Sequence, residues 1–140
     1  MKILFDTNVV LDVLLDRSPH VNAAVVLMSS VERGLIEGFL CANSLTMIEY
    51  ITTRTHDRLT ARKAVRNLLE IFQVAEVNQT TLRLALDSPF TDFEDAVLYQ
   101  AGVGAGVDAV VTRNGRAFKK TKLPILSPRE LCGLLQQKGD

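Results

Sequence analysis

Short apolar segments recur along the chain, and segments of helical character separate each one from the next. This alternation is typical of α/β proteins, in which strands pair in parallel and helices cover the sheet. We therefore expect an α/β fold with a mostly parallel central sheet of four or five strands. The predicted strands are residues 2–6, 38–42, 74–77 and 108–112, with residues 124–126 as a fifth strand at an edge.

The segments between these strands carry apolar residues at helical spacing. Thr91 and Glu94 fit a capping box, and so do Ser127 and Glu130, so a helix is expected to start at each pair. The predicted helices are residues 9–15, 19–32, 43–54, 57–72, 80–86 and 91–102, with a last helix that begins near residue 127.

Length and composition limit the classes of protein to consider. The 140 residues suffice for one domain with its own core, and we expect a single domain over residues 1–140. Lys and Arg number 16, as do Asp and Glu, so a uniformly basic surface is excluded but a local basic patch is not. The two cysteines and two histidines lack the spacing of a zinc site or a disulfide scaffold. Without a secretory leader or an apolar run of about 18 residues, we expect a cytoplasmic protein with no membrane association.

Acidic residues fall where a parallel sheet would gather them. Sites in such sheets lie beyond the carboxyl ends of the strands, and Asp6 ends the first predicted strand. Glu49 lies one turn into the helix after the second strand. Asp92 and Asp95 are three residues apart, so both project from one face of a helix start. Asn114 follows the fourth strand.

Each acid also has an ordinary structural explanation. Asp6 can cap the following helix, and Asp92 can favour the dipole of its own helix. Glu49 can close a capping box with Thr46. We interpret five other aspartates as surface or turn residues, namely Asp12, Asp16, Asp57, Asp87 and Asp108.

Together, the carboxylates favour a metal site. Several carboxylates at one sheet edge repel one another unless they bind protons or cations. Oxygen ligands without His or Cys suit Mg²⁺ or Mn²⁺, which activate water and polarise phosphoryl oxygens. The sequence contains no Walker loop, no Gly-x-Ser-x-Gly motif and no dinucleotide-binding glycine motif that would indicate a different chemistry.

Four motifs resemble those of the PIN-domain family, small Mg²⁺/Mn²⁺-dependent ribonucleases that include the VapC-type toxins. Their order and spacing agree over essentially the whole chain. The motifs are residues 3–8 (Ile-Leu-Phe-Asp-Thr-Asn), 44–49 (Ser-Leu-Thr-Met-Ile-Glu), 92–96 (Asp-Phe-Glu-Asp-Ala) and 111–114 (Val-Thr-Arg-Asn). The resemblance implies a three-layer α/β/α sandwich.

The resemblance also implies roles for individual residues. Asp6, Glu49 and Asp95 match the three invariant acids of the family, and Asp92 matches an additional acid of a subgroup with an Asp-x-x-Asp-Ala helix. The fourth acid of many toxins falls on Asn114, which can ligate through its carbonyl but brings no charge. We therefore predict that the four acids are catalytic and that they bind the metal together with Asn114.

RNA is the substrate that the resemblance implies, with an antitoxin protein as partner and a homodimer as assembly. Basic residues after the fourth predicted strand offer a rim that can hold phosphates beside the acids. Arginines at positions 58, 62 and 66 repeat along the long helix 57–72. The predicted substrate-binding residues are Thr7, Asn8, Thr112, Arg113, Arg116 and Lys119.

The predicted function is therefore a metal-dependent endoribonuclease, the toxin of a type II toxin–antitoxin pair. The alternative is a PIN-fold protein that binds RNA or serves as a scaffold without useful catalysis, which the uncharged Asn114 favours. His20 and His56 lie outside all four motifs, so we expect hydrolysis by activated water, giving a 3′-hydroxyl and a 5′-phosphate.

Overall fold

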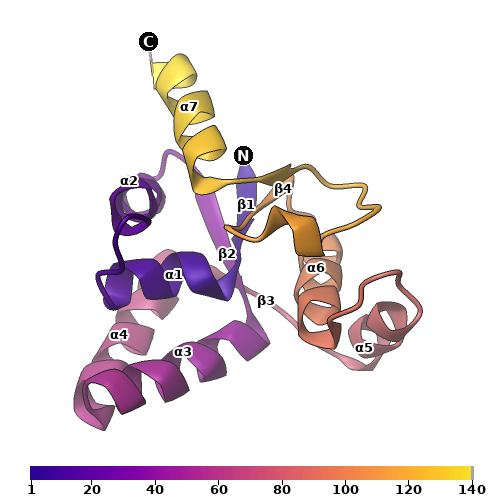
Figure 1. Cartoon of the computed structure of the whole chain (residues 1–140), viewed down its shortest axis with the longest axis horizontal. Coiled ribbons are helices and arrows are strands. Elements are labelled where there is room, and N and C mark those ends of the chain that lie inside the picture. The colour runs from indigo at the N-terminus through magenta and orange to yellow at the C-terminus, as the bar shows by residue number, and fades with distance from the viewer. Residues whose placement is uncertain (140) are drawn as a thin grey trace.

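The computed structural model describes residues 1–139 and contains a five-stranded sheet in which every strand pair is parallel (Figure 1). The strand order is β3-β2-β1-β4-β5, so the first strand lies at the centre. The fifth strand lies at an edge, as predicted. Asp140, the last residue of the predicted domain, lies outside the described residues. The strands are β1 (Lys2–Phe5), β2 (Glu37–Cys41), β3 (Gln73–Ala75), β4 (Ala109–Val111) and β5 (Ile125–Leu126).

Helices connect the strands in the predicted order, although several boundaries move by a few residues. Within residues 1–139, no helix has both the length and the apolar character that crossing a membrane requires. The helices are α1 (Thr7–Leu14), α2 (Val21–Glu32), α3 (Ala42–Thr55), α4 (Arg58–Ile71), α5 (Gln79–Leu86), α6 (Phe93–Ala105), the 3₁₀ turn η1 (Gly115–Ala117) and α7 (Pro128–Gly139).

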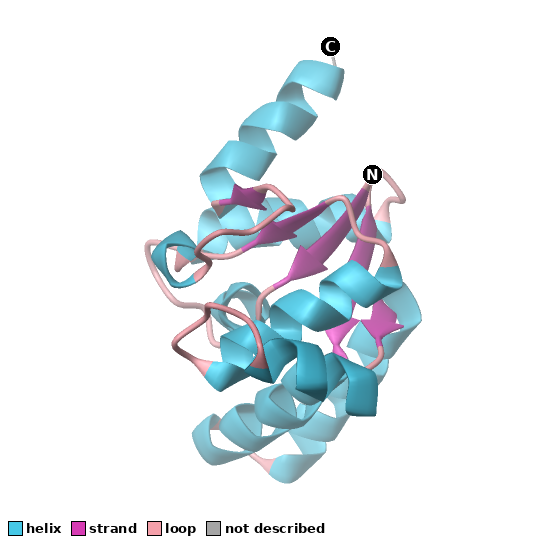
Figure 2. Cartoon of the chain, turned by 90° about the vertical axis from the view of Figure 1, so that its right-hand side faces the viewer, coloured by secondary structure: helices cyan, strands magenta, loops and turns pink. Residues whose placement is uncertain are grey.

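Alternate residues of β1 face two separate cores, because successive side chains of a strand point to opposite faces. Ile3 and Phe5 pack with residues of α1, α2, α3, α4 and α7, including Leu27 and Leu131. Leu4 faces the other side and packs with Leu98 of α6. Figure 2 shows helices in front of the sheet and behind it. The predicted three-layer α/β/α arrangement is therefore confirmed.

Helix α6 lies unusually close to the central strand. A Cβ atom at Gly102 would come within 2.8 Å of Cδ2 of Leu4, so only glycine allows this approach without a shift of the leucine. Because α6 leads into β4, and β4 runs parallel to β1, the helix runs antiparallel to the strands. Its first turn is thereby held at the carboxyl edge of the sheet.

The two predicted capping boxes have different outcomes. The box at the start of α7 is confirmed, since the Glu130 amide donates to Oγ of Ser127 and the Ser127 amide donates to Oε1 of Glu130. The box of Thr91 and Glu94 is wrong. Helix α6 begins at Phe93 and is capped by Asp92, the residue after Thr91, whose Oδ1 accepts from the amide of Asp95.

The interpretation of Asp12 as a surface or turn acid is also wrong. Asp12 lies within α1, and its exposed fraction is 0%. Its carboxylate is paired with the guanidinium groups of Arg17 and Arg113, which compensate its burial. The apolar spacing of α1 gave no sign of the contact with Arg113, which lies about a hundred residues away along the chain.

Candidate active site

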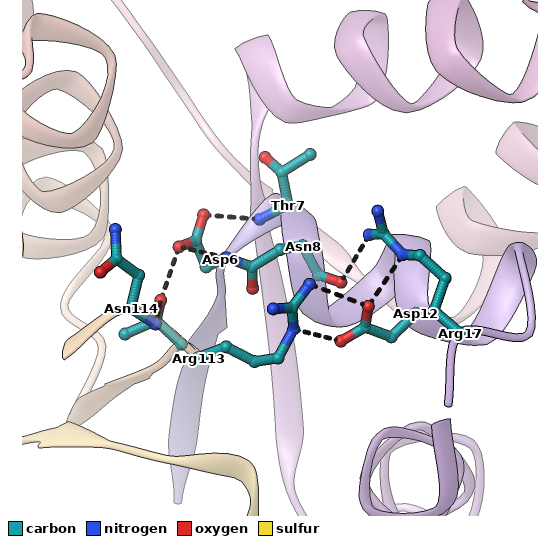
Figure 3. A network of polar contacts seen from close by, with 8 residues as sticks. Asp6, Thr7, Asn8, Asp12, Arg17, Arg113 and Asn114 are labelled. Carbon is teal, nitrogen blue, oxygen red and sulfur yellow. Dashed lines mark hydrogen bonds and ion pairs between the residues drawn. The ribbon is translucent and has the colours of Figure 1, made fainter. Parts of the chain in front are cut away.

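The ends of β1 and β4 bring Asp6 and Thr112 together. Phe5 and Val111 are paired in the sheet, and the Asp6 amide extends this ladder by donating to the carbonyl of Val111 at 2.9 Å. Thr112 Oγ1 donates to Oδ2 of Asp6 at 2.7 Å, and this contact appears as one of the dashed lines in Figure 3. Two segments separated by a hundred residues thereby fix one carboxylate at the carboxyl edge of the sheet.

Asp6 also caps α1, since its Oδ1 accepts from the amide of Thr7 at 2.7 Å. The capping explanation offered for this residue is therefore correct for one of its two oxygens. Only 7% of Asp6 is exposed. Burial raises the pKa of Asp6, and the hydrogen bonds from Thr112 and Thr7 together with the charge of Arg113 offset this only in part. Ionisation of Asp6 is thus less favourable than that of an exposed aspartate.

Asn8 and Thr7 extend the site towards α3. Nδ2 of Asn8 lies 3.4 Å from Oδ2 of Asp6, and both side chains are labelled in Figure 3. Among the described residues, the buried Oδ1 of Asn8 has no hydrogen-bond donor. Oγ1 of Thr7 donates to Oγ of Ser44 at 2.7 Å, which ties the first turn of α1 to the start of α3. The oxygen of Asn8 is therefore a buried acceptor with unused capacity beside the carboxylate.

The start of α6 supplies further negative charge. Oδ1 of Asp92 accepts the Asp95 amide at 2.9 Å, which leaves its second oxygen outside the cap. The pKa of Asp95 is raised from 3.8 to about 6, first by burial and then by the negative charges of Asp6 and its neighbours Asp92 and Glu94. Asp6, Asp92 and Asp95 therefore belong to one electrostatic environment.

Glu94 also contributes negative charge here, although the sequence indicated only a capping role for it. Its charge contributes to the raised pKa of Asp95 and, after burial, to that of the Cys41 thiol. Cys41 ends β2, so the negative field spans the ends of the two neighbouring strands β1 and β2 and the start of α6. Its position between Asp92 and Asp95, within the first helical turn, is the signal that indicates this role.

The side chain of Glu49 contacts residues of α3 and α4. Its Oε1 accepts from Oγ1 of Thr53 at 2.8 Å, and its Oε2 lies 3.7 Å from Nε of Arg62 on α4. The alternative capping box with Thr46 is wrong, because that hydroxyl donates to the carbonyl of Asn43. Across residues 1–139, no three side chains of the types His, Cys, Asp and Glu are grouped closely enough to hold an ion.

The residues after β4 occupy different surroundings. The Asn114 amide donates to Oγ1 of Thr112 at 3.0 Å, which places Asn114 beside the residue that holds Asp6. The guanidinium of Arg113 forms two hydrogen bonds with Asp12, at 2.6 and 3.1 Å. Arg116, in η1, and Lys119 are exposed. Of the predicted basic rim, Arg113 is thus held in place by an acid, whereas Arg116 and Lys119 lie at the surface.

The donors at the sheet edge fit a hard divalent cation. Asp6 and Asp95 have pKa values raised by burial and like charge, a condition that a cation relieves. The unpartnered oxygen of Asn8 adds a neutral donor. A set made only of carboxylate and amide oxygens suits Mg²⁺ or Mn²⁺.

Comparisons with known proteins agree with this architecture. A family profile described as "PIN domain" matches residues 2–116. No curated protein matches the sequence. Several solved structures, however, share the fold.

VapBC2 from Rickettsia felis, bound to a DNA fragment from its promoter, matches with a TM-score of 0.66 and 12% identity over 91% of this chain and 98% of the other. A toxin–antitoxin complex from Klebsiella pneumoniae gives 0.67 and 17% identity over 90% and 97%. VapC20 from Mycobacterium tuberculosis, a sarcin–ricin loop cleaving toxin, gives 0.66 and 15% identity over 87% and 98%. At these identities the likeness is one of fold.

Proposed function

The chain belongs to the PIN-domain family, and on that basis we propose that it is a metal-dependent endoribonuclease that cleaves RNA phosphodiester bonds. We further propose that residues 1–140 form one such domain, and that it acts in the cytoplasm as the toxin of a type II toxin–antitoxin pair. Support for this role comes from structures of similar fold, which include toxin–antitoxin complexes and a toxin that cleaves the sarcin–ricin loop.

The observation that carries the proposal is the raised pKa of Asp95, to about 6, beside the buried Asp6. Two such carboxylates, with Asp92 at the helix start, would hold a divalent ion, with Asn8 or Asn114 as neutral donors. The ion would supply a water molecule of lowered pKa and would neutralise charge on the phosphodiester. The hydrogen bonds from Thr112 and Thr7 keep the Asp6 carboxylate oriented towards the edge of the sheet.

Glu49 is the residue that must change its contacts if it joins the ion. The proposal gives it a ligand role, whereas its carboxylate now contacts Thr53 and Arg62. Its side chain is 28% exposed and its ion pair is long, at 3.7 Å, so little free energy opposes its release. Glu49→Gln should then weaken Mn²⁺ binding less than Asp6→Asn does, because Glu49 must first leave its contacts with Thr53 and Arg62 and therefore adds less to the affinity.

The decisive experiment is cleavage of structured RNA by the purified protein with Mn²⁺, Mg²⁺ or EDTA. Asp6→Asn should abolish cleavage, and Mn²⁺ binding measured by calorimetry should weaken in parallel. Asp87→Asn, which removes an exposed carboxylate outside the site, is the matched control. His56→Ala should leave cleavage intact. Cleavage that persists in EDTA, or products with a 2′,3′-cyclic phosphate, would contradict the proposed mechanism.

A second function is favoured by one observation, namely that among residues 1–139 no three potential ligands are grouped closely enough to hold an ion. A PIN-fold protein of this kind would bind RNA, or serve as a scaffold, without cutting it. RNA binding without cleavage in either Mg²⁺ or Mn²⁺, by a folded protein, would decide for this function.

We also propose an antitoxin protein as partner and a homodimer as assembly. On α2, Val25 and Val26 are 46% and 51% exposed, while Ala24 and Leu27 are buried in the core. Exposed valines beside a buried face leave apolar surface that a second copy would cover. Light scattering of the concentrated protein tests this, and a monomer would refute it.

A further inference from the structure

A pocket outside the acidic site lies where three segments meet. The connection between α1 and α2, the residue that follows Thr112, and the first turn of α7 enclose about 240 Å³. Its walls combine apolar and cationic side chains, and none of the described residues that line it is acidic. The residues that line it include Pro19, His20, Ala23, Arg113, Pro128 and Arg129.

Arg113 brings positive charge that its buried partner does not cancel. Asp12 accepts hydrogen bonds from both Arg113 and Arg17, so two guanidinium groups share one carboxylate (Figure 3). Arg113 uses one hydrogen of Nε and one of Nη2 for Asp12, and a guanidinium has five N–H donors. Its remaining donors, on a side chain that is 28% exposed, are available to a ligand in the pocket.

Arg129 lies where it does not help its own helix. It occupies the first turn of α7, and a positive charge at a helix N-terminus opposes the helix dipole. Within residues 1–139 it forms no ion pair with an acid. His20, at the start of α2, likewise makes no capping hydrogen bond with its side chain. These two residues therefore have no evident structural partner at the mouth of the pocket.

We propose that this pocket binds a backbone phosphate of the RNA strand, adjacent to the phosphodiester held at the acidic site. This inference rests on the proposed function. Arg113, which lines the pocket, directly follows Thr112, whose hydroxyl donates to Asp6, so the pocket and the acidic site share the segment that follows β4. The volume is below that of usual sites for drug-sized ligands, and it suits a phosphate with its ribose against Pro19, Ala23 and Pro128.

The test measures binding of a labelled single-stranded RNA oligonucleotide to the full chain by fluorescence anisotropy in EDTA, where no cleavage occurs. Arg129→Gln and His20→Ala remove the two side chains of the pocket that have no evident structural partner. Arg33→Gln and His56→Ala are matched controls, because both are exposed and lie outside the pocket. Thermal unfolding of each variant verifies that the chain is folded.

We expect Arg129→Gln to weaken RNA binding three- to tenfold and to reduce the slope of log K against log salt by about 0.7, the value for one phosphate contact on a single strand. His20→Ala should have a smaller effect in the same direction, and both controls should change affinity less than twofold. Equal losses in variants and controls, unchanged affinity in the pocket variants, or no RNA binding by the wild type would overturn the proposal. Stronger competition by a polyglutamate peptide than by unlabelled RNA would assign the pocket to an acidic protein partner instead.

The result of the RNA-binding test can be distinguished from the result of the cleavage test. If Asp6→Asn abolishes Mn²⁺-dependent cleavage while Arg129→Gln and His20→Ala bind RNA like the wild type, only the pocket assignment fails. If the pocket variants lose RNA affinity while no metal supports cleavage, the phosphate site stands and the nuclease assignment fails.

Discussion

Replacing Asp95 by Asn is expected to stabilise the ion-free protein at neutral pH. Burial and the neighbouring negative charges raise the pKa of Asp95 from 3.8 to about 6 in the folded protein. Between about pH 4 and pH 6, the unfolded chain has therefore lost a proton that the folded protein still binds. The stability that this proton gives is fully present below about pH 4, and it is lost as the pH rises through 6.

The size of the effect follows from the two pKa values. One pH unit of difference corresponds to about 1.36 kcal/mol, so a change from 3.8 to about 6 would amount to about 3 kcal/mol for a fully buried carboxyl. Asp95 is only partly buried at the start of α6, and solvent screens its interactions with the other carboxylates. We therefore expect Asp95→Asn to raise the free energy of unfolding by about 1 kcal/mol at pH 7.5 and by much less at pH 4.5.

Urea unfolding in EDTA at these two pH values measures the difference between the variant and the wild type. Taking the difference removes the contributions of titrating groups that do not interact with Asp95. Asp87→Asn at the exposed end of α5 removes the same charge outside the site, and it should change stability by less than about 0.5 kcal/mol at either pH. A loss of stability in Asp95→Asn at pH 7.5, or an equal gain at both pH values, would refute the argument.

Three further predictions concern the same region. Asp12→Asn should lower the free energy of unfolding by about 2–3 kcal/mol, measured by urea unfolding, because it leaves two partly buried guanidinium groups without their carboxylate. Asp92→Asn should keep the α6 cap while weakening Mn²⁺ binding by calorimetry, whereas Asp92→Ala should also lose about 1 kcal/mol of stability. Saturation with Mn²⁺ at a hundred times its Kd should stabilise the wild type by about 2.7 kcal/mol in thermal unfolding, and an equal gain in Asp6→Asn would contradict the assignment of that ligand.

The sequence predicted the fold well because its strands are defined by local features. Each predicted strand is a short apolar segment bounded by polar residues, and helical spacing fills the intervals, so the parallel sheet followed from pattern alone. The boundaries moved because ends of helices depend on which side chain reaches the first amides. At α6, Asp92 reaches the Asp95 amide, and this contact displaces the capping box that Thr91 and Glu94 would have formed.

The candidate site was less predictable, because it depends on contacts between distant segments. The proximity of Asp6 and Thr112 could be expected from the sequence, because the carboxyl ends of parallel strands lie at the same edge of a sheet. The burial of Asp12 could not be predicted, since it requires Arg113, which follows β4, to reach α1. The contact of Glu49 with Arg62 could not be predicted either, because it depends on how α3 packs against α4.

The capping and metal-binding interpretations of the acids are compatible rather than competing, because a carboxylate has two oxygens. Asp92 uses one oxygen to cap α6, and the cap aligns the helix so that its first turn carries Asp95 towards Asp6. Asp6 caps α1 through Oδ1, while Oδ2 accepts from Thr112. The hydrogen bonds that begin two helices thus also hold these carboxylates in fixed positions at one edge of the sheet. The mutual repulsion of these carboxylates lowers the stability of the ion-free protein. A divalent cation would relieve this repulsion, and the free energy of that relief would add to its binding affinity.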